Sequence, residues 1–222
     1  MDTETTDIPK DIRAEYNDVN LQDGTWPWIT EISWQVLQFS EDLHECLQDS
    51  AQLSSVADYL LKPTFSPEMY SKEAQEVTGI SYESLADSCW NIEYVLRDFI
   101  NALKSVDFVV SHNATFDMKV VKAEMLRNNI DQHLRIVPWV DTMWISQKFV
   151  NVRTSKNRLK YPTLTELYRK IYDSVPLKKH TADSDVDTLI KCFNGLVKNE
   201  IITPERIKLR IEKHVSSDNN FR

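Results

Sequence analysis

Apolar and polar residues alternate along the stretch from Ile29 to Phe39, which is also rich in β-branched side chains. This period of two predicts a β-strand, and we expect Val56 to Lys62 to be its antiparallel partner. The polar residues 40–55 between them are then an elaborated hairpin connection. The apolar run from Asp107 to Ser111 is typical of a strand buried inside a sheet, and a further short strand is predicted at Ile136 to Trp139.

Helical signals lie between and after these strands. Ser66 offers an N-cap and Pro67 suits a first helical position, so we expect a helix that runs to Thr78 and ends at Gly79. Further helices are predicted at residues 90–104, from 113 to about 127, and at 142–149, 164–172 and 182–198, with a charged C-terminal helix opening at 203 and a frayed tail at 216–222. The alternation indicates an α/β fold, with one domain over residues 1–202 and a C-terminal helix and tail over 203–222.

The composition fits a single large domain. The 222 residues are 41% hydrophobic, which suffices for a substantial core. No apolar run approaches the roughly 18 residues of a membrane span, and the acidic start from Met1 to Glu4 is unlike a signal peptide. The three cysteines are odd in number and widely spaced, which argues against disulfides and a zinc site. We therefore expect a soluble, cytoplasmic protein with no membrane partner.

The net charge of −8 is unevenly distributed along the chain. Residues 1–100 carry 5 Lys+Arg against 20 Asp+Glu, whereas residues 101–222 carry 21 against 14. The densest basic stretch includes Lys148, Arg153, Lys156, Arg158 and Lys160. Such a stretch suits a phosphate backbone, although a run of basic residues is more often an ordinary solvated surface.

Acidic residues near the N-terminus and after the buried strand are candidates for chemistry. Asp2 and Glu4 are two residues apart, so on a strand both carboxylates reach the same side of the sheet. Asp117 closes Asn113-Ala-Thr-Phe-Asp117 in the first turn of a helix that starts at a strand's end, where ligands usually bind in such sheets. The alternative is a capped helix start, with Asn113 as the cap and Asp117 favoured by the helix dipole.

A third motif precedes the last long helix. His180 lies five positions before Asp185 in His-Thr-Ala-Asp-Ser-Asp, and here too the acids have a reading as helix-capping residues. Four carboxylates brought to one point repel each other unless cations lie between them, and a pair of divalent ions in such a site supports in-line phosphoryl chemistry. The motifs together therefore indicate a nuclease.

In motif order and spacing, the chain resembles the DEDD exonucleases of the histidine type, the group that includes the proofreading epsilon subunit of bacterial DNA polymerase III and ribonuclease T. The similar segments are Asp2-Thr-Glu-Thr-Thr6, Trp26 to Ser33, Thr78-Gly-Ile80, His112-Asn-Ala-Thr-Phe-Asp117, Asp141-Thr142, and His180 with Asp185. The resemblance implies a ribonuclease H-like mixed sheet flanked by helices. It also implies a two-metal 3′–5′ exonuclease that releases nucleoside monophosphates from DNA or RNA, in proofreading or repair, and it admits a polymerase or a second copy of the chain as partner.

Residue by residue, the resemblance makes Asp2, Glu4, Asp117 and Asp185 the holders of two Mg²⁺ or Mn²⁺ ions and His180 the base that takes a proton from the attacking water. It also suggests substrate contacts from Thr5, Thr6, Asn113 and Phe116 to a single-stranded 3′ end, with a purely structural role as the alternative. The choice between DNA and RNA stays open, because recognition of the 2′-OH depends on a few pocket contacts.

Two features depart from the family pattern. Asp7 follows Thr6 where relatives have glycine, which places a carboxylate and a more restricted backbone beside the expected nucleotide site. Relatives also have an apolar strand before the first motif, whereas here only Met1 precedes Asp2. We therefore expect a truncated first strand, with about five to eight mostly apolar residues encoded upstream of Met1. A shortened strand leaves a second reading open: a catalytically inactive member that binds nucleic acid or a partner protein.

Overall fold

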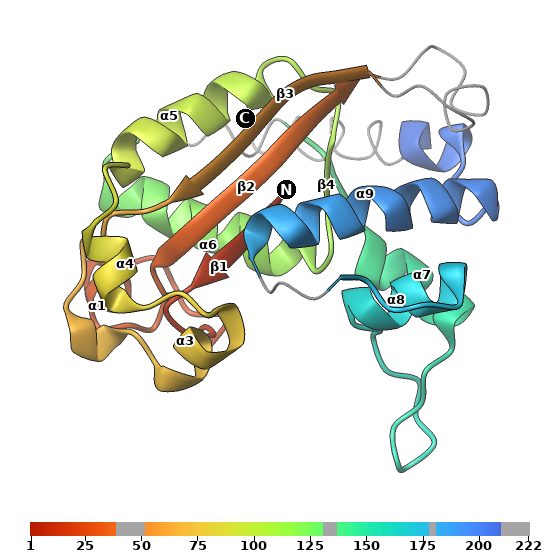
Figure 1. Cartoon of the computed structure of the whole chain (residues 1–222), viewed down its shortest axis with the longest axis horizontal. Coiled ribbons are helices and arrows are strands. Elements are labelled where there is room, and N and C mark those ends of the chain that lie inside the picture. The colour runs from red at the N-terminus through yellow and green to blue at the C-terminus, as the bar shows by residue number, and fades with distance from the viewer. Residues whose placement is uncertain (39–51, 131–136, 178–180, 210–222) are drawn as a thin grey trace.

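Three strands form an antiparallel sheet in the computed structural model, which describes residues 1–38, 52–130, 137–177 and 181–209 (Figure 1). β1 (Asp2–Thr5) pairs with β2 (Ile29–Gln38), and β2 pairs along its other edge with β3 (Gln52–Leu60). The predicted hairpin is therefore confirmed, although β3 starts before Val56 and ends before Lys62. Residues 39–51, where most of the expected connection falls, lie outside the described residues.

A parallel pair of short strands, β4 (Val109–Ser111) and β5 (Trp139–Asp141), lies beside the amino end of β1. The α-amino group of Met1 donates a hydrogen bond to the Val110 carbonyl over 2.9 Å, which joins β1 to β4. The strand predicted at 136–139 is displaced toward the C-terminus. Pro138 has no N–H to donate to a neighbouring strand, and its carbonyl accepts from Val109 at the point where the pairing of β4 and β5 begins.

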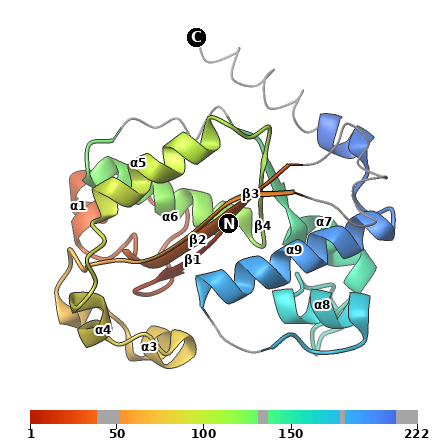
Figure 2. The same cartoon turned by 45° about the horizontal axis from the view of Figure 1, so that its top comes forward.

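Helices cover both faces of these strands (Figure 2). α5 (Ile92–Leu103) and α6 (Ala114–Arg127) lie on one face, and α9 (Ala182–Lys198) crosses the other, with α8 (Leu164–Tyr172) and α7 (Thr142–Val150) packed beside it. The core on the α5 side includes Ile32, Phe99 and Met125, and that around α9 includes Leu167 and Phe193; all are buried. The predicted α/β architecture is confirmed.

Caps set several helix boundaries as the sequence predicted. α8 begins with a capping box, in which the Thr163 hydroxyl accepts from the Glu166 N–H over 3.1 Å and the Glu166 carboxylate accepts from the Thr163 N–H over 2.8 Å. Thr181 caps α9, where its hydroxyl accepts from the Ser184 N–H. Both helices have the predicted bounds, 164–172 and 182–198.

The single helix expected at 66–78 is wrong. The chain instead makes a 3-10 turn (Pro67–Met69), an extended link at Tyr70, and then α3 (Lys72–Thr78), which ends at Gly79 as predicted. Ser71 is the effective cap, since its hydroxyl accepts from the Ala74 N–H while its own N–H donates to the Thr6 carbonyl. This contact with the end of β1, together with burial of the Tyr70 ring, fixes the break. Two helices of five residues, α1 (Asp18–Gln22) and α4 (Tyr82–Ala86), were not predicted.

Buried Arg127 at the end of α6 fixes the segment that leads into β2. Its guanidinium donates to the carbonyls of Leu21, Trp26 and Pro27 and pairs with Glu124 over 2.9 Å. Glu124 in turn accepts from the N–H of Ile29, the first residue of β2. These contacts fix where β2 begins, and β2 positions β1.

The described part of the predicted C-terminal helix is a helical turn at residues 204–209. Ile207 in this turn and Ile202 before it are buried in the core around α9. The tail predicted at 216–222 lies outside the described residues, and the division at residue 202 stays a prediction. No helix among the described residues is long and apolar enough to span a membrane.

Candidate active site

β1 presents two carboxylates on one side of the sheet, as its period of two predicts. Asp2 lies opposite Ser33 and Glu4 opposite Glu31 in the antiparallel pairing with β2. Thr3, between them, points to the other side, where its hydroxyl donates to Asp117 over 2.8 Å. The backbone pairing therefore sets the spacing of the two acids.

The first turn of α9 brings a third carboxylate to this place. One carboxylate oxygen each from Asp2, Glu4 and Asp185 lie within 4.8 Å of one another, and all three side chains are half-buried. Asp185 is held by the helix start, where its N–H donates to the Thr181 carbonyl over 3.0 Å. The structure thus brings together three of the four acids that the sequence singled out.

Asp117 lies beside this group with its carboxylate already engaged. It is 2% exposed, and its two oxygens accept hydrogen bonds from the hydroxyls of Thr3 and Ser111. Burial raises the pKa of Asp117 to about 6, although the hydrogen bonds from Ser111 and Thr3 act to lower it. Two hydroxyl donors thus partly compensate the loss of water around a buried anion.

The electrostatics of Asp2, Glu4 and Asp185, the three-carboxylate group, favour a bound cation. Burial raises the pKa of Asp2 well above its usual value, and the nearby carboxylates of Asp117, Glu4 and Asp185 raise it further. The pKa of Glu4 rises to about 8, through burial first and then through Asp185, Glu31 and Asp117. Each acid therefore makes ionisation of its neighbours more costly. An all-oxygen donor set of this kind fits Mg²⁺ or Mn²⁺, and a divalent ion would stabilise the ionised carboxylates.

Glu31 is a further acid near these carboxylates, since its charge raises the pKa of Glu4, and the sequence alone assigned it no role. It is 6% exposed on β2, and its carboxylate accepts from the N–H of Ala182, the first residue of α9, over 2.8 Å. Burial raises its pKa to about 7, against the lowering effect of the Ala182 hydrogen bond. Glu31 thereby ties the helix that carries Asp185 to the strand that faces β1. The sequence feature that could have pointed to Glu31 is its position as an acid inside the largely apolar segment 26–33.

His112 and Asp141 hold the start of α6 in place. The His112 ring nitrogens lie 3.0 Å from the Thr142 hydroxyl and 3.0 Å from the Pro162 carbonyl, and burial lowers the pKa of the ring. Asp141 caps α7 through the Met143 N–H and also accepts from the Asn113 N–H over 3.1 Å. Both residues belong to the motifs seen in the sequence, but their positioning role depends on contacts between distant segments.

The expected substrate contacts are placed as follows. The Thr5 hydroxyl donates to the Asp7 carbonyl over 2.6 Å, and the buried Thr6 hydroxyl accepts from the Trp28 N–H over 3.1 Å. Asn113 lies at the N-cap position of α6, as the capping alternative predicted, but its backbone is left-handed with φ 77° and its side chain makes no capping hydrogen bond. Phe116 is partly buried against the core on the α5 side. His180 lies outside the described residues.

Comparison with solved structures shows the same fold at low sequence identity. Exonuclease X in complex with 5′ overhanging duplex DNA is 20% identical, with a TM-score of 0.57 over 95% of this chain and 96% of that one. A 3′-exonuclease solved in 3′-end specific recognition of a histone mRNA stem-loop is 12% identical, with a TM-score of 0.60 over 89% and 80%. E. coli exonuclease I with a dA16 oligonucleotide is 13% identical, with a TM-score of 0.58 over 93% and 41%. The predicted ribonuclease H-like fold is therefore confirmed.

A search of curated protein sequences gave no match. The family model described as Exonuclease, RNase T, matches residues 48–193, which include Asp117 and Asp185 but not Asp2 or Glu4. The match covers most of the chain, and the fold agrees with it. The chain therefore belongs to the RNase T family of exonucleases, the 3′–5′ exonucleases of the DEDD type with histidine.

Proposed function

We propose that the protein is a metal-dependent 3′–5′ exonuclease that hydrolyses phosphodiester bonds of DNA or RNA from the 3′ end and releases nucleoside monophosphates. The observation that carries the proposal is the meeting of Asp2, Glu4 and Asp185 within 4.8 Å in a member of an exonuclease family. Three acids in one half-buried place are costly unless cations neutralise them, and a phosphodiester is itself anionic.

In this proposal Asp2, Glu4, Asp117 and Asp185 hold two Mg²⁺ or Mn²⁺ ions. When bound, such ions supply Lewis-acid chemistry, namely a lower pKa for the attacking water and stabilisation of charge on the leaving 3′ oxygen. His180 accepts the water proton as the water oxygen bonds to phosphorus. The bond from phosphorus to the 3′ oxygen then breaks, the 3′ oxygen takes up a proton, and a nucleoside 5′-monophosphate leaves.

The proposal is tested by incubating 5′-labelled oligonucleotides of DNA and of RNA with the protein and Mg²⁺ or Mn²⁺. We expect products that shorten from the 3′ end and nucleoside monophosphates in solution, both abolished by EDTA. Both carboxylate oxygens of Asp117 already accept hydrogen bonds from protein hydroxyls rather than being left for a metal ion. This observation favours a second candidate, an inactive member that binds nucleic acid. If the protein binds the oligonucleotide but does not shorten it under any of the metal conditions, the second candidate is correct.

Thr5, Thr6, Asn113 and Phe116 are proposed to contact the terminal nucleotide. The Thr5 and Thr6 hydroxyls already bond to backbone groups, so any contact with substrate from these two positions is shared with a structural role. A part in proofreading or repair, a polymerase or homodimer partner, and a cytoplasmic location stay predictions.

Replacing His180 by Ala is expected to slow hydrolysis by roughly 100-fold, the usual scale of a lost general base. Metal binding should be nearly unchanged, because four carboxylates remain to hold the ions. The check combines single-turnover rates with a Mn²⁺ titration followed by thermal melting. A rate within twofold of that of the parent protein would contradict the proposed role of His180. A loss of metal affinity as large as the loss of rate would contradict it as well.

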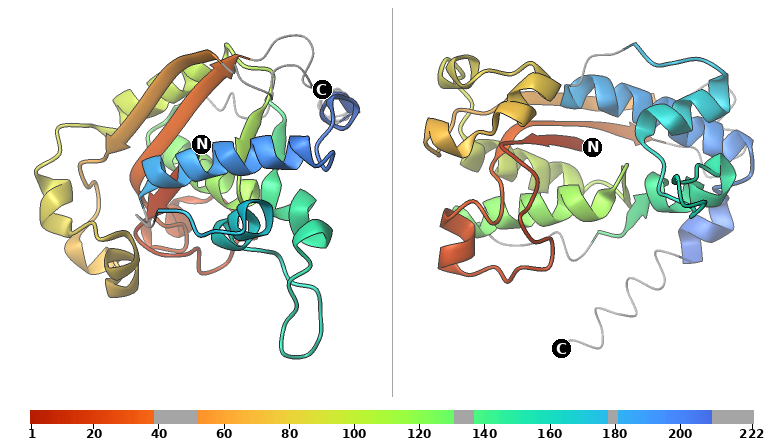
Figure 3. Two further views of the ribbon diagram at one scale, coloured as in Figure 1. Left: turned by 45° about the vertical axis from the view of Figure 1, so that its right-hand side comes forward. Right: turned by 90° about the horizontal axis from the view of Figure 1, so that it is seen from below.

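A basic loop between α7 and α8 extends from the body of the protein (Figure 3). Its two sides meet in a bridge between Arg153 and Leu159, and Thr154 bonds across it to Arg158 over 2.8 Å. The side chains of Arg153, Lys156 and Arg158 are exposed. Lys160 differs, because its ammonium pairs with Glu166 over 2.8 Å. The three exposed cations are thus better placed than Lys160 to meet phosphates.

Changing Arg153, Lys156 and Arg158 together to Gln is expected to weaken oligonucleotide binding and to flatten its salt dependence. If each contacts one phosphate of a single strand, the slope of log K against log salt falls by about 0.7 per residue. The rate at saturating substrate should stay the same. A matched triple change to Gln of three exposed lysines, Lys104 directly after α5 and Lys191 and Lys198 on α9, serves as control. An equal slope in both triple variants would return the loop to an ordinary solvated surface.

A further inference from the structure

A cavity of about 760 Å³ opens between α7, the start of α6 and the segment from Ile201 to Ile207. Its lining combines aromatic, cationic and hydrogen-bonding side chains, which include Trp139, Trp144, Gln147, Lys148 and Arg206. Pockets that hold a small organic ligand have volumes of roughly 300–1,000 Å³. The cavity is therefore large enough for one nucleotide.

Trp144 on α7 gives this cavity an uncovered aromatic surface. It is 63% exposed, although tryptophan is a largely buried residue on average. Its ring contacts no other ring among the residues that the structure describes, and its backbone is fixed by the cap of α7, where its N–H donates to Asp141 over 3.3 Å. A planar indole in this position is suited to stacking on a nucleic-acid base, an interaction that every base can make.

Two cations line the cavity together with this ring. Lys148 lies one helical turn after Trp144 on α7, so both side chains lie on the same face of the helix. Lys148 forms no ion pair with any described residue. Arg206 comes from the helical turn at 204–209, where its guanidinium donates to the Ile201 carbonyl. Cations beside an exposed ring are suited to the phosphate of a stacked nucleotide.

Asp141 is the only acid among the lining residues, and its charge is already engaged. One of its carboxylate oxygens accepts from the backbone N–H of Asn113 over 3.1 Å and from that of Met143 over 2.9 Å. These donors offset the negative charge, so the lining as a whole favours an anion.

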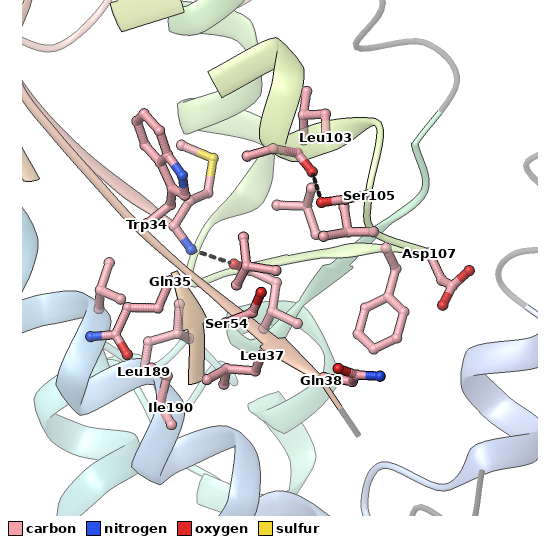
Figure 4. A pocket seen from close by; sticks show the side chains of 18 of the residues that line it. Trp34, Gln35, Leu37, Gln38, Ser54, Leu103, Ser105, Asp107, Leu189 and Ile190 are labelled. Carbon is pink, nitrogen blue, oxygen red and sulfur yellow. Dashed lines mark hydrogen bonds between the residues drawn. The ribbon is translucent and has the colours of Figure 1, made fainter. Parts of the chain in front are cut away.

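A cavity of about 640 Å³ between β2, α5 and α9 has the opposite chemistry (Figure 4). In Figure 4, Leu37, Leu103, Leu189 and Ile190 lie around it, and Asp107 is the only charged side chain among its lining residues. Apolar walls with a single acid disfavour a phosphate. The combination of an exposed ring with cations is therefore a property of the cavity beside α7, and not of cavities in this fold generally.

The cavity beside α7 lies next to the proposed active site. The Asp141 carboxylate that lines it also holds the Asn113 N–H, and Ala114 and Thr115, the first two residues of α6, line it as well. Asp117 follows two positions later in the same helical turn. A strand whose 3′ end reaches the carboxylates therefore has this cavity within reach of a nearby nucleotide.

We propose that this cavity binds one nucleotide of a single-stranded nucleic acid, with the base stacked on the Trp144 ring and the phosphate held by Lys148 and Arg206. The inference rests on the proposed function in one respect, namely that the strand is the substrate. The site holds the strand while its 3′ end lies at the three-carboxylate group. Because stacking is tolerant of sequence, the site holds strands of any base composition.

The test measures binding of a ten-nucleotide deoxyadenosine strand in EDTA, where metal-dependent hydrolysis is prevented. Trp144→Ala is expected to raise Kd about tenfold, and Trp144→Phe, which keeps an aromatic face, by no more than about threefold. Tyr94→Ala, at a residue 55% exposed on α5, serves as the matched control and should leave Kd unchanged. Equal affinity of the parent protein and Trp144→Ala, or binding by neither, would overturn the proposal.

Strands that each lack one base test for direct contact with a base. At one position, removal of the base should cost the parent protein about tenfold in affinity but cost Trp144→Ala almost nothing, since the stacking partner is already gone. The same loss in both proteins at every position would show a structural role for Trp144 and overturn the proposal. Lys148→Gln should lower the slope of log K against log salt by about 0.7, and an unchanged slope would contradict the phosphate contact.

Free deoxyadenosine monophosphate distinguishes a nucleotide of the strand from a released product. We expect it to bind roughly 100-fold more weakly than the strand, because it lacks the neighbouring phosphates. Affinity equal to that of the strand, lost in Trp144→Ala, would assign the cavity to the free nucleotide and overturn the proposal. An inactive protein whose strand binding depends on Trp144 would contradict the proposed function alone, whereas an active exonuclease that binds strands equally well without Trp144 would contradict this inference alone.

Discussion

Replacing Asp185 by Asn is expected to lower the rate of nucleotide release by about 1,000-fold or more while the protein stays folded. The change keeps the shape of the side chain but removes one of the three charges that meet within 4.8 Å. The metal affinity of the site should fall, because a neutral amide binds a hard divalent ion more weakly than a carboxylate does. The metal-free protein should melt at an equal or higher temperature, since Asp185 raises the pKa of Asp2 and Glu4 and thus opposes their ionisation.

Asp183 offers a matched control in the same helical turn. Both residues lie in the first turn of α9 and favour its positive end equally, but Asp183 is not in the three-carboxylate group. Asp183→Asn should therefore retain most of the activity and the affinity for Mn²⁺. The check compares single-turnover rates and Mn²⁺ affinities of the two variants. Similar losses of rate and affinity in both would mean that weaker helix capping, rather than a damaged metal site, explains the effect of Asp185→Asn.

The sequence predicted the parts of the fold that local signals determine. α8 and α9 have the predicted bounds because Thr163 and Thr181 cap them, and the alternation after Ile29 gave β2. The extended link at Tyr70 escaped prediction, because it depends on the contact of Ser71 with Thr6 and on burial of an aromatic ring. The five-residue helices α1 and α4 are too short for a periodic pattern to form.

The acids of the site were predictable, but their surroundings were not. The spacing of Asp2 and Glu4 on a strand correctly placed both on one side of the sheet. The sequence also singled out Asp117 but not its hydroxyl donors, since Thr3 lies 114 positions away in the sequence. The role of Glu31 at the start of α9 needs a contact across 151 positions. Sequence spacing thus identifies the charged residues, and the tertiary fold decides which groups satisfy them.

The metal-free protein is expected to lose thermal stability as the pH rises from about 5 to about 8, and to regain it when Mn²⁺ is added. Folding raises the pKa of Glu4 from 4.5 to about 8, that of Glu31 from 4.5 to about 7, and that of Asp117 from 3.8 to about 6. At a pH between the unfolded and the folded pKa of each group, the carboxyl group is ionised in the unfolded chain but protonated in the folded chain. Stability from these groups is therefore complete below about pH 4 and is lost as the pH rises through the folded values.

The size of the effect and its cause are both measurable by melting in EDTA across this pH range. We expect Tm to fall by about 5 to 10 °C from these groups, and saturating Mn²⁺ at pH 8 to restore a similar amount. The metal effect should be smaller at pH 5, where protons compete for the same oxygens. Glu4→Gln removes the highest of the three pKa values and should flatten the curve above pH 7, whereas Glu93→Gln, at an exposed residue paired with Arg97, should leave the curve unchanged. A Tm in EDTA that stays constant or rises over this range would show that the three carboxylates are not held close together in the metal-free protein, and with that the physical case for a cation between them would fail.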